Sequence, residues 1–471
     1  MNIDRREFLK LGAGAASTFA LAGGSLLVAA ASDESLRLAG GEHLFLDDYL
    51  IATQSGFRRV IEPPARLPEP IVNSAQDQCF QPYVSVVRDP KTKRFRMWYN
   101  VPESSTRSHI AYMESDDGIR WIRPHRVLKD PVEISFGASI IDEGPDFCDP
   151  IRRFKLATEN GGLWISFSPD GLNWTAAAGE PALRGIGDIV FLSRDPIRNR
   201  YLLTCKANSR PEDGYKGSTQ NSREGHRRLV GQSVSADCIH WSPMKRIILA
   251  DERDEGITEF YSIGGVIARG GLLIGLLKVL RDDLPHEPDA EVHGIGYTCL
   301  AWTRDGENWE RDREPFLPRN PEPGTWDRAM TWGDWQLPVD DELYIYYGGY
   351  ARGHKVERFT ERQLGLARMP LDRYVSRDAD AEGGSLRTPP MILDASKLTL
   401  NAEAGGEIRA RVLDQSGAPV TGFDEKDCKP VCGDSQRHAL EWSKPLASLK
   451  GRPVQLEFLL RDARLYGFAV A

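Results

Sequence analysis

The sequence has few cysteines, no strong excess of charge of either sign, and no long hydrophobic run beyond its N-terminal segment. Its 60 basic and 68 acidic residues give a formal net charge of −8, which provides no general attraction to nucleic acid or anionic lipid. The 44 glycines and 30 prolines are scattered without a short period, which excludes a collagen-like chain. After residue 35 no amphipathic 3.6-residue period of any length occurs, so strands are favoured over helices.

The seven cysteines cannot all form disulfides, and no group of Cys and His has the spacing of a zinc site. Five of them lie in or beside β-like segments, where they are most simply small buried hydrophobes: Cys79, Cys148, Cys205, Cys238 and Cys299. Cys428 and Cys432 are four residues apart in a loop. A disulfide between these two is left open.

The first 31 residues have the features of an export signal. Adjacent Arg5 and Arg6, followed by residues 8–10 (Phe-Leu-Lys), resemble a twin-arginine signal, and residues 29–31 (Ala-Ala-Ala) offer a cleavage site. An uncleaved membrane anchor is the alternative, but the apolar run is Gly-rich and no second span follows it. We therefore expect export by the twin-arginine route to the periplasm or the cell exterior, with no membrane attachment after the signal is removed.

A seven-residue pattern, Ser/Thr-x-Asp-Gly/Cys-x-x-Trp, occurs four times and indicates an internal repeat. Its aspartates are 53, 67 and 68 residues apart: Asp117, Asp170, Asp237 and Asp305. Each copy follows a short strand-like run, and upstream of that run lies another β pattern with a turn. The triplet Arg-Asp-Pro occupies the same offset at residues 88–90 and 194–196, so these two segments are copies of one unit.

Five such units, each of about 50 to 70 residues and four short strands, predict an all-β fold with a five-bladed β-propeller over residues 40–376. One twisted blade cannot bury both of its faces alone, whereas a ring of blades buries them against each other and leaves only short edges. We expect residues 42–60 to supply a strand that closes the ring.

We interpret the repeated Asp-Gly-x-x-Trp pattern as structural. Glycine permits the turn, aspartate caps it through backbone hydrogen bonds, and tryptophan packs between neighbouring blades. A residue that catalysis needs once would not recur at four equivalent places.

The composition changes after Tyr374. Residues 377–390 are polar and Gly-rich, as expected of a linker. Alternating strand patterns then return in residues 391–471, separated by loop signals at residues 414–417 and 449–452. This pattern predicts a C-terminal antiparallel β-sandwich of about 80 residues.

A propeller with these turns, followed by a small sandwich, resembles the invertase, levansucrase and arabinanase superfamily of carbohydrate-active enzymes. The sandwich most resembles that of glycoside hydrolase family 32, notably in residues 417–423 (Gly-Ala-Pro-Val-Thr-Gly-Phe) and 465–468 (Leu-Tyr-Gly-Phe). The Asn-Asp-Pro-Asn opening of that family's first blade and the Glu-Cys pair of its third blade are absent. The Arg-Asp-Pro triplets lie after the first strand of a blade, so they are not assigned as catalytic.

The candidate catalytic groups are acids at the starts of the innermost strands. Glycoside hydrolysis needs two carboxyl groups flanking the scissile bond. Alignment of the units places Asp77, Asp188 and Glu259 at or near such starts. We predict Asp77 as nucleophile or base, Asp188 as the carboxylate that orients the sugar and tunes charge, and Glu259 as general acid, an order that mirrors the resembling family. Asp327 and Asp334 are further candidates should one of these three acids lie outside the site. The alternative for each acid is a strand cap or an ion pair with arginine.

Long charged loops beside aromatic residues support a polar ligand, which we expect to be a carbohydrate. The candidate substrate-binding residues are Gln81, Trp98, Lys206, Arg281, Asp327, Trp332, Arg352 and His354. The several arginines leave room for an anionic sugar. The sequence predicts no cofactor and no metal ligands, and it leaves open a structural or funnel-bound divalent cation.

The leading hypothesis is an exported glycoside hydrolase that acts on oligo- or polysaccharides. A non-catalytic propeller that binds carbohydrate or a partner is the second, because the family's catalytic signatures are missing. A sialidase-like enzyme is weaker, since the repeat of that family has one more residue between Asp and Gly and its propellers usually have six blades.

Overall fold

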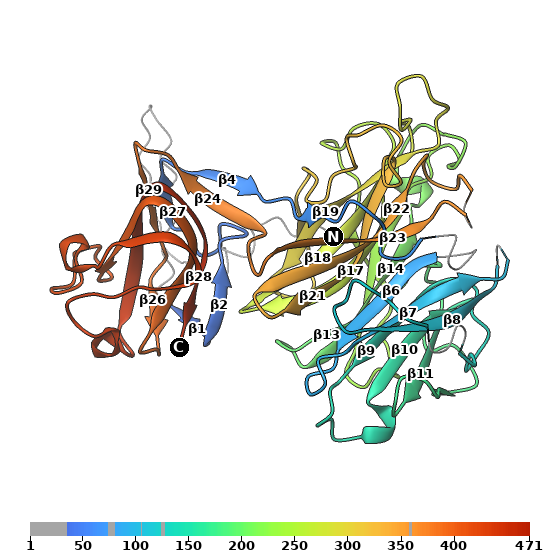
Figure 1. Cartoon of the computed structure of the whole chain (residues 1–471), viewed down its shortest axis with the longest axis horizontal. Coiled ribbons are helices and arrows are strands. Elements are labelled where there is room, and N and C mark those ends of the chain that lie inside the picture. The colour runs from blue at the N-terminus through green and yellow to red at the C-terminus, as the bar shows by residue number, and fades with distance from the viewer. Residues whose placement is uncertain (1–34, 74–80, 105, 124–127, 358–359) are drawn as a thin grey trace, which may run out of the picture. The chain divides into compact units, whose positions relative to one another are not determined.

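The computed structural model describes residues 35–73, 81–104, 106–123, 128–357 and 360–471, which are mostly β-strand (Figure 1). The helical elements in this part of the chain are short 3₁₀ turns: η1 (Pro150–Arg152), η2 (Pro211–Asp213), η3 (Glu425–Asp427) and η4 (Leu446–Leu449). None of the described residues forms a helix with the length and apolarity that a membrane crossing requires. The predicted all-β fold is confirmed. The predicted signal, residues 1–31, lies outside the described residues.

Between residues 65 and 370, the described strands pair into five antiparallel groups, and a single parallel bridge between Gly296 and Met330 joins the fourth to the fifth. The first group is β6 (Gln81–Arg88), β7 (Phe95–Pro102) and β8 (Ser108–Ser115). The second is β9 (Ala138–Asp142), β10 (Phe154–Glu159), β11 (Leu163–Ser168) and β12 (Thr175–Ala176). The third is β13 (Val190–Asp195), β14 (Arg200–Asn208), β15 (Arg228–Ser235) and β16 (Lys245–Ile248). The fourth is β17 (Thr258–Arg269), β18 (Leu272–Arg281), β19 (Ile295–Thr303) and β20 (Glu310–Arg311). The fifth is β21 (Met330–Val339), β22 (Glu342–Tyr350), β23 (Gln363–Pro370) and β5 (Ala65–Arg66).

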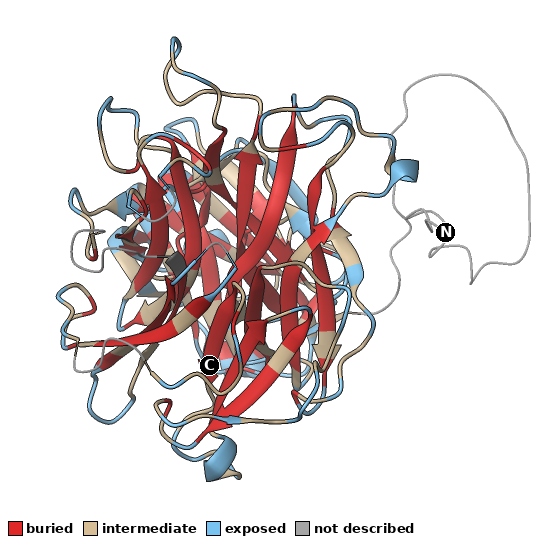
Figure 2. Cartoon of the chain, turned by 90° about the vertical axis from the view of Figure 1, so that its right-hand side faces the viewer, coloured by how far each residue is buried: buried red, intermediate tan, exposed pale blue. Residues whose placement is uncertain are grey.

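The first strands of these groups contact one another in a cycle, β6 to β9 to β13 to β17 to β21 and back to β6. Serine side chains join neighbours in this cycle: the Ser85 hydroxyl accepts the Ile140 N–H at 2.8 Å, and the Ser139 hydroxyl accepts the Leu192 N–H at 3.0 Å. Most residues of the inner strands are buried, and exposure is concentrated in the loops (Figure 2). The strands thus bury their faces against neighbouring groups, as a propeller requires.

The repeated pattern forms the same turn in all four copies. The Ser or Thr hydroxyl accepts the N–H of the Gly or Cys position at 2.8–3.0 Å. The aspartate Oδ1 accepts the backbone N–H groups of the two residues that follow the Gly or Cys position, at 2.7–2.8 Å. The Gly position has φ near +70°, for example 75° at Gly171, and Cys238 adopts the same conformation at 66°. The interpretation of the pattern as a structural turn is confirmed.

These turns also join neighbouring groups. The Trp98 Nε1–H on β7 donates to the carbonyl of Gly171 at 2.7 Å, and the Gln232 side chain on β15 donates to that of Gly306 at 2.9 Å. The Trp309 indole in turn donates to the Gln232 side-chain oxygen at 2.7 Å. The turns at Gly171 and Gly306 are therefore held by the sheets beside them.

The outermost strand of the fifth group comes from the N-terminal side of the chain, because β5 pairs with β23. The expectation that residues 42–60 supply the closing strand is wrong. In that segment β2 (Gly41–Leu44), β3 (Thr53–Ser55) and β4 (Arg58–Ile61) pair with C-terminal strands. The physical reason is burial: Phe45 packs against Phe458 and Phe468, with ring centroids 5.9 and 5.7 Å apart.

The C-terminal strands and the first strands of the chain form one paired set, in which blue β2 lies beside red C-terminal strands in Figure 1. Besides β2 to β4, it contains β1 (Leu36–Leu38), β24 (Val375–Ala379), β25 (Gly384–Arg387), β26 (Met391–Leu393), β27 (Leu398–Leu413), β28 (Val431–Ala439) and β29 (Pro453–Val470). The bridge of β1 to β26 is parallel and the other pairings of this set are antiparallel. Residues 377–390, expected as a linker, contain β25 and most of β24.

The cysteines follow the prediction in part. Cys205, Cys238 and Cys299 are buried as predicted, whereas Cys148 is exposed and Cys79 lies outside the described residues. Cys148 is exposed because it sits in a loop beside η1 rather than in a strand. Cys428 and Cys432 both carry free thiols, so they do not form a disulfide.

Candidate functional site

A cavity of about 290 Å³ lies where the innermost strands begin. All five strand groups contribute to it, through Tyr83 on β6, Phe136 before β9, Asp188 before β13, Tyr261 on β17 and Trp332 on β21. The remaining lining residues are Ile189, Lys206, Arg228, Tyr350, His354, Lys355 and Arg362. The size is at the lower end of the range for small-molecule sites.

Asp188 forms an ion pair with Lys206 in this cavity. The pairing of the third group places them together, because the Gly187 N–H donates to the Lys206 carbonyl at 2.8 Å and the Lys206 N–H donates to the Ile189 carbonyl at 3.1 Å. The Asp188 side chain is 42% exposed, so it faces the solvent of the cavity. A solvent-facing carboxylate beside an ammonium group can accept sugar hydroxyls or take part in acid–base chemistry.

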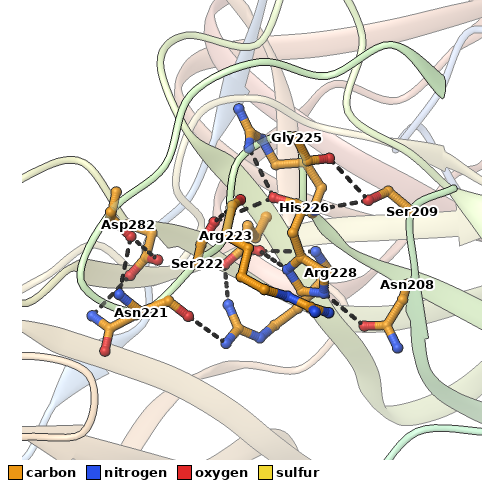
Figure 3. A network of polar contacts seen from close by, with 12 residues as sticks. Asn208, Ser209, Asn221, Ser222, Arg223, Gly225, His226, Arg228 and Asp282 are labelled. Carbon is orange, nitrogen blue, oxygen red and sulfur yellow. Dashed lines mark hydrogen bonds and ion pairs between the residues drawn. The ribbon is translucent and has the colours of Figure 1, made fainter. Parts of the chain in front are cut away.

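Glu259 lies behind Arg228, with no exposed surface. Its Oε1 accepts the Arg228 backbone N–H at 2.9 Å, and its Oε2 pairs with the Arg228 guanidinium. Burial raises the pKa of Glu259, and the Arg228 guanidinium opposes that effect. The Arg228 guanidinium also donates to the Asn221 carbonyl at 3.2 Å (Figure 3). Arg228 is therefore held from behind on two sides while it lines the cavity.

An insertion between β14 and β15, residues 209–227, is fastened to the buried carboxylate of Asp282 (Figure 3). The Thr219 hydroxyl donates to Asp282 Oδ2 at 2.6 Å, and the Asn221 amide donates to Oδ1 at 3.2 Å. Burial raises the pKa of Asp282, and the bond from Thr219 opposes this. The anchor fixes Asn221, whose carbonyl holds Arg228, so the insertion contributes to the cavity wall.

Aromatic side chains form much of the remaining wall. The rings of Tyr261 and Trp332 lie 4.6 Å apart, and the rings of Trp332 and Tyr350 lie 6.0 Å apart. The Tyr261 hydroxyl is 3.2 Å from His354 Nε2, and Tyr83 packs against Phe136 at 5.6 Å. Faces of this kind bind the apolar side of a sugar ring, while polar groups bind its hydroxyls.

Glu159, at the end of β10, is a second carboxyl group, and its backbone hydrogen-bonds to Ser135 and Gly137 on either side of the lining residue Phe136. Its side chain is buried, and its Oε1 accepts the Gly161 N–H at 2.9 Å. Burial raises its pKa, the backbone bond to Gly161 opposes this, and the charge of Asp188 raises it further. A carboxyl group with a raised pKa beside an ionised one is the electrostatic pattern of a proton donor and its partner.

Beneath the cavity lies a buried ion pair between Lys278 on β18 and Asp334 on β21. The Lys278 ammonium lies 4.4 Å from the ring centroid of Phe191 and 5.2 Å from that of Tyr83. Because Tyr83 also lines the cavity, this pair lies directly behind the wall.

The structure brings together four of the residues predicted from sequence, namely Asp188, Lys206, Trp332 and His354. Asp77 lies outside the described residues, and Gln81 is the first residue of β6.

The other predicted substrate-binding residues do not line the described part of the cavity. Trp98 packs between Tyr112 and Phe154, and Arg281 pairs with Asp283 at 3.0 Å. Asp327 accepts the Tyr347 hydroxyl at 3.1 Å, and Arg352 pairs with Glu361.

Sequence reasoning missed several residues of the site. Those that line the cavity are Tyr83, Phe136, Ile189, Arg228, Tyr261 and Arg362, and Glu159 lies next to Phe136 through its backbone hydrogen bonds. The search considered acids at the starts of first strands, whereas Glu159 and Arg228 lie at the end of a second strand and the start of a third. The repeat marks these strand positions, but it does not show which of them face the cavity.

Among the described residues, no group of three or more His, Cys, Asp or Glu side chains is placed to hold a metal ion.

No protein-family model matches this chain, and no curated protein matches its sequence. Solved structures do match. A glycoside hydrolase is 12% identical over 66% of this chain and 93% of its own, with a TM-score of 0.46. An N-acetylgalactosamine deacetylase from F. plautii, in complex with blood group B trisaccharide, is 14% identical over 67% and 96%, with a TM-score of 0.45. A family 32 β-fructofuranosidase from Bombyx mori is 11% identical over 85% and 95%, with a TM-score of 0.38. All three similarities are at low sequence identity and at TM-scores below 0.5.

Proposed function

We propose that the protein hydrolyses glycosidic bonds of oligo- or polysaccharides in the cavity at the starts of the inner strands. The observation that carries this proposal is the meeting of a solvent-facing carboxylate, Asp188, with an aromatic wall in one cavity. Aromatic faces and charged hydrogen-bonding groups together form a site for a sugar, and a carboxylate supplies the first group that hydrolysis needs.

Asp188 acts as the ionised carboxylate of the reaction. Lys206 fixes its orientation, since both side chains are carried by adjacent backbone segments that hydrogen-bond to each other. Glu159 is the proton donor in this proposal, because its backbone hydrogen-bonds to Ser135 and Gly137 on either side of the lining residue Phe136. Burial and the charge of Asp188 also raise its pKa. Asp77 stays a prediction from sequence for the nucleophile or base.

The contacts of Glu259 favour a positioning role. Both of its carboxylate oxygens are engaged by Arg228, and the side chain has no exposed surface. It would hold Arg228 toward the substrate rather than donate a proton itself. The prediction that Glu259 is the general acid remains testable by the same variants.

A carbohydrate-binding protein without catalysis is the second candidate. It is favoured by one observation: Asp188 is the single acidic residue among the described lining residues of the cavity. Such a protein would bind glycans without releasing reducing ends.

The test is reducing-sugar release from a panel of plant and algal glycans by the mature protein. We expect Asp188→Asn and Glu159→Gln each to lower kcat by roughly a hundredfold or more, while glycan binding persists. Glu259→Gln should weaken binding more than it lowers kcat, because it acts through Arg228. Full activity of Asp188→Asn would refute the hydrolytic site. Glycan binding by the wild type without any release would establish the second candidate.

A further inference from the structure

The charged side chains that reach the cavity are mostly cationic. Of its twelve described lining residues, one is an acid, and four are lysine or arginine: Lys206, Arg228, Lys355 and Arg362. The acid, Asp188, is already paired with Lys206. Arg228 is paired with Glu259 behind the wall, so the described charges at the cavity are four cations and two acids.

Two of these cations, Arg228 and Arg362, are held in the same way. The guanidinium carbon of Arg228 lies 5.1 Å from the ring centroid of Tyr261, and that of Arg362 lies 5.0 Å from the ring centroid of Tyr350. Both arginines are buried, and both rings belong to the cavity wall. Stacking on an aromatic ring fixes the plane of a guanidinium group and leaves its edge for hydrogen bonding.

Arg228 is also fixed from behind by Glu259 and by the Asn221 carbonyl. Its side chain is 10% exposed, which makes rotation away from the cavity costly. Lys355 and Arg362 come from the segment between β22 and β23, whereas Arg228 comes from the third group. The cations therefore converge on one space from separate elements.

We propose that the cavity recognises the anionic substituent of a sugar, a carboxylate or a sulfate ester, through Arg228, Lys355 and Arg362. The proposal rests on the proposed function for the sugar itself and adds the class of substrate. Guanidinium groups donate two parallel N–H bonds to carboxylate or sulfate oxygens, and such charge-assisted bonds are stronger than bonds to hydroxyls. A neutral sugar offers only hydroxyl oxygens, which compensate less of the cost of desolvating the cations.

The test is calorimetric binding of matched sugar pairs to the mature protein. The first pair is methyl glucuronide and methyl glucoside, and the second is galactose 6-sulfate and galactose. We expect at least one acidic member to bind about tenfold or more tightly than its neutral partner, and this preference to shrink with added salt. The pair that shows the preference distinguishes a carboxylate from a sulfate.

Variants assign the preference to the cavity. Lys355→Gln and Arg362→Gln should each reduce it several-fold. Arg228→Gln alone would leave Glu259 buried beside a neutral partner, so the double variant Arg228→Gln/Glu259→Gln keeps a neutral hydrogen-bonded pair there. Arg200→Gln is the control, because Arg200 is a half-buried arginine of the same strand group that pairs with Asp195 outside the described lining. It should keep the preference of the wild type.

The outcomes separate this proposal from the proposed function. Equal binding of acidic and neutral partners, or a preference that survives all the cavity variants, overturns the anion site. Preferential binding of an acidic sugar without hydrolysis of acidic glycans leaves the anion site standing and refutes hydrolysis. Hydrolysis of neutral glycans without any preference for acidic sugars supports the proposed hydrolysis and refutes the anion site.

Discussion

At the scale of single residues, one feature with a high cost of burial is the ion pair between Lys278 and Asp334. Both side chains are 1% exposed. Burial raises the pKa of Asp334 to about 6 against the attraction of Lys278, and burial lowers the pKa of Lys278 against the attraction of Asp334. An enclosed pair adds little stability over apolar side chains, but either charge alone is costly.

We therefore expect Asp334→Asn to lower the free energy of unfolding by about 3 kcal/mol, because Lys278 is left buried without its counter-charge. The double variant Lys278→Met/Asp334→Leu should recover most of that loss. Urea denaturation of the three proteins checks both. Equal stability of Asp334→Asn and the wild type would show that the pair is not enclosed in solution.

The raised pKa of Glu159 predicts how the activity depends on pH. Its pKa is raised by burial and by Asp188, and only its protonated form can donate a proton. Activity should therefore be present below the raised pKa and fall as pH rises through it. Glu159→Gln should lower kcat/KM by roughly a hundredfold and remove this alkaline decline. Profiles of kcat/KM against pH for both proteins test the assignment, and an unchanged profile would reassign the acid.

At the scale of elements, the repeated turns make a local contribution to stability. Burial alone would raise the pKa of Asp170, but bonds from the Asn173 backbone and side chain, among others, lower it to about 2. For a carboxyl group with a lowered pKa, the stabilisation is present above the ordinary value of about 4 and is lost as pH falls toward 2.

Asp170→Ala should lower the free energy of unfolding by about 1 kcal/mol at neutral pH, because two backbone N–H groups lose their acceptor. Asp170→Asn keeps an acceptor oxygen and should lose less. Denaturation at neutral pH and again near pH 3 measures the free energy of unfolding of both variants. The difference in this free energy between the wild type and Asp170→Ala should be smaller near pH 3. A gap that widens there would contradict the capping role.

The insertion of residues 209–227 depends on one buried carboxylate. Asp282→Ala removes the acceptor of Thr219 and Asn221, so the segment should open more often. We expect trypsin to cut after Lys216 and Arg223 about tenfold faster than in the wild type, the effect of losing roughly one to two hydrogen bonds. Asp283→Ala, which breaks only the neighbouring pair with Arg281, is the matched control. Equal rates of cleavage in the two variants would show that Asp282 does not hold this segment in place.

The parts that the sequence could predict are those with a local signal. The turn motif carries its own hydrogen-bonding groups within seven residues, so its fourfold recurrence indicated both the turns and the units. Asp188 and Lys206 were found because the units repeat in register. Arg228 and Glu159 were missed because a long insertion precedes the first and a different strand carries the second. The place of Glu159 beside the cavity depends on the packing of the second strand group against the third, which no local pattern encodes.

At the scale of the whole molecule, we propose export with removal of residues 1–31, a segment outside the described structure. Replacing Arg5 and Arg6 by lysine should leave an uncleaved precursor in the cell, because the paired arginines are the signal of this route. Intact mass and N-terminal sequencing of cell and periplasmic fractions check this. A mature N-terminus far from Ala31, or normal export of the variant, would contradict it.

The pairing of the first strands with the last has a consequence for the order of synthesis. β2 reaches its place beside β29 only when residues 453–470 have been made, more than 400 residues after β2 itself. At a synthesis rate of roughly 5–20 residues per second, the first strands wait for tens of seconds with unpaired edges. The N-terminal strands are thus made long before the strands with which they pair, and for that interval their edges are open to pairing with other chains.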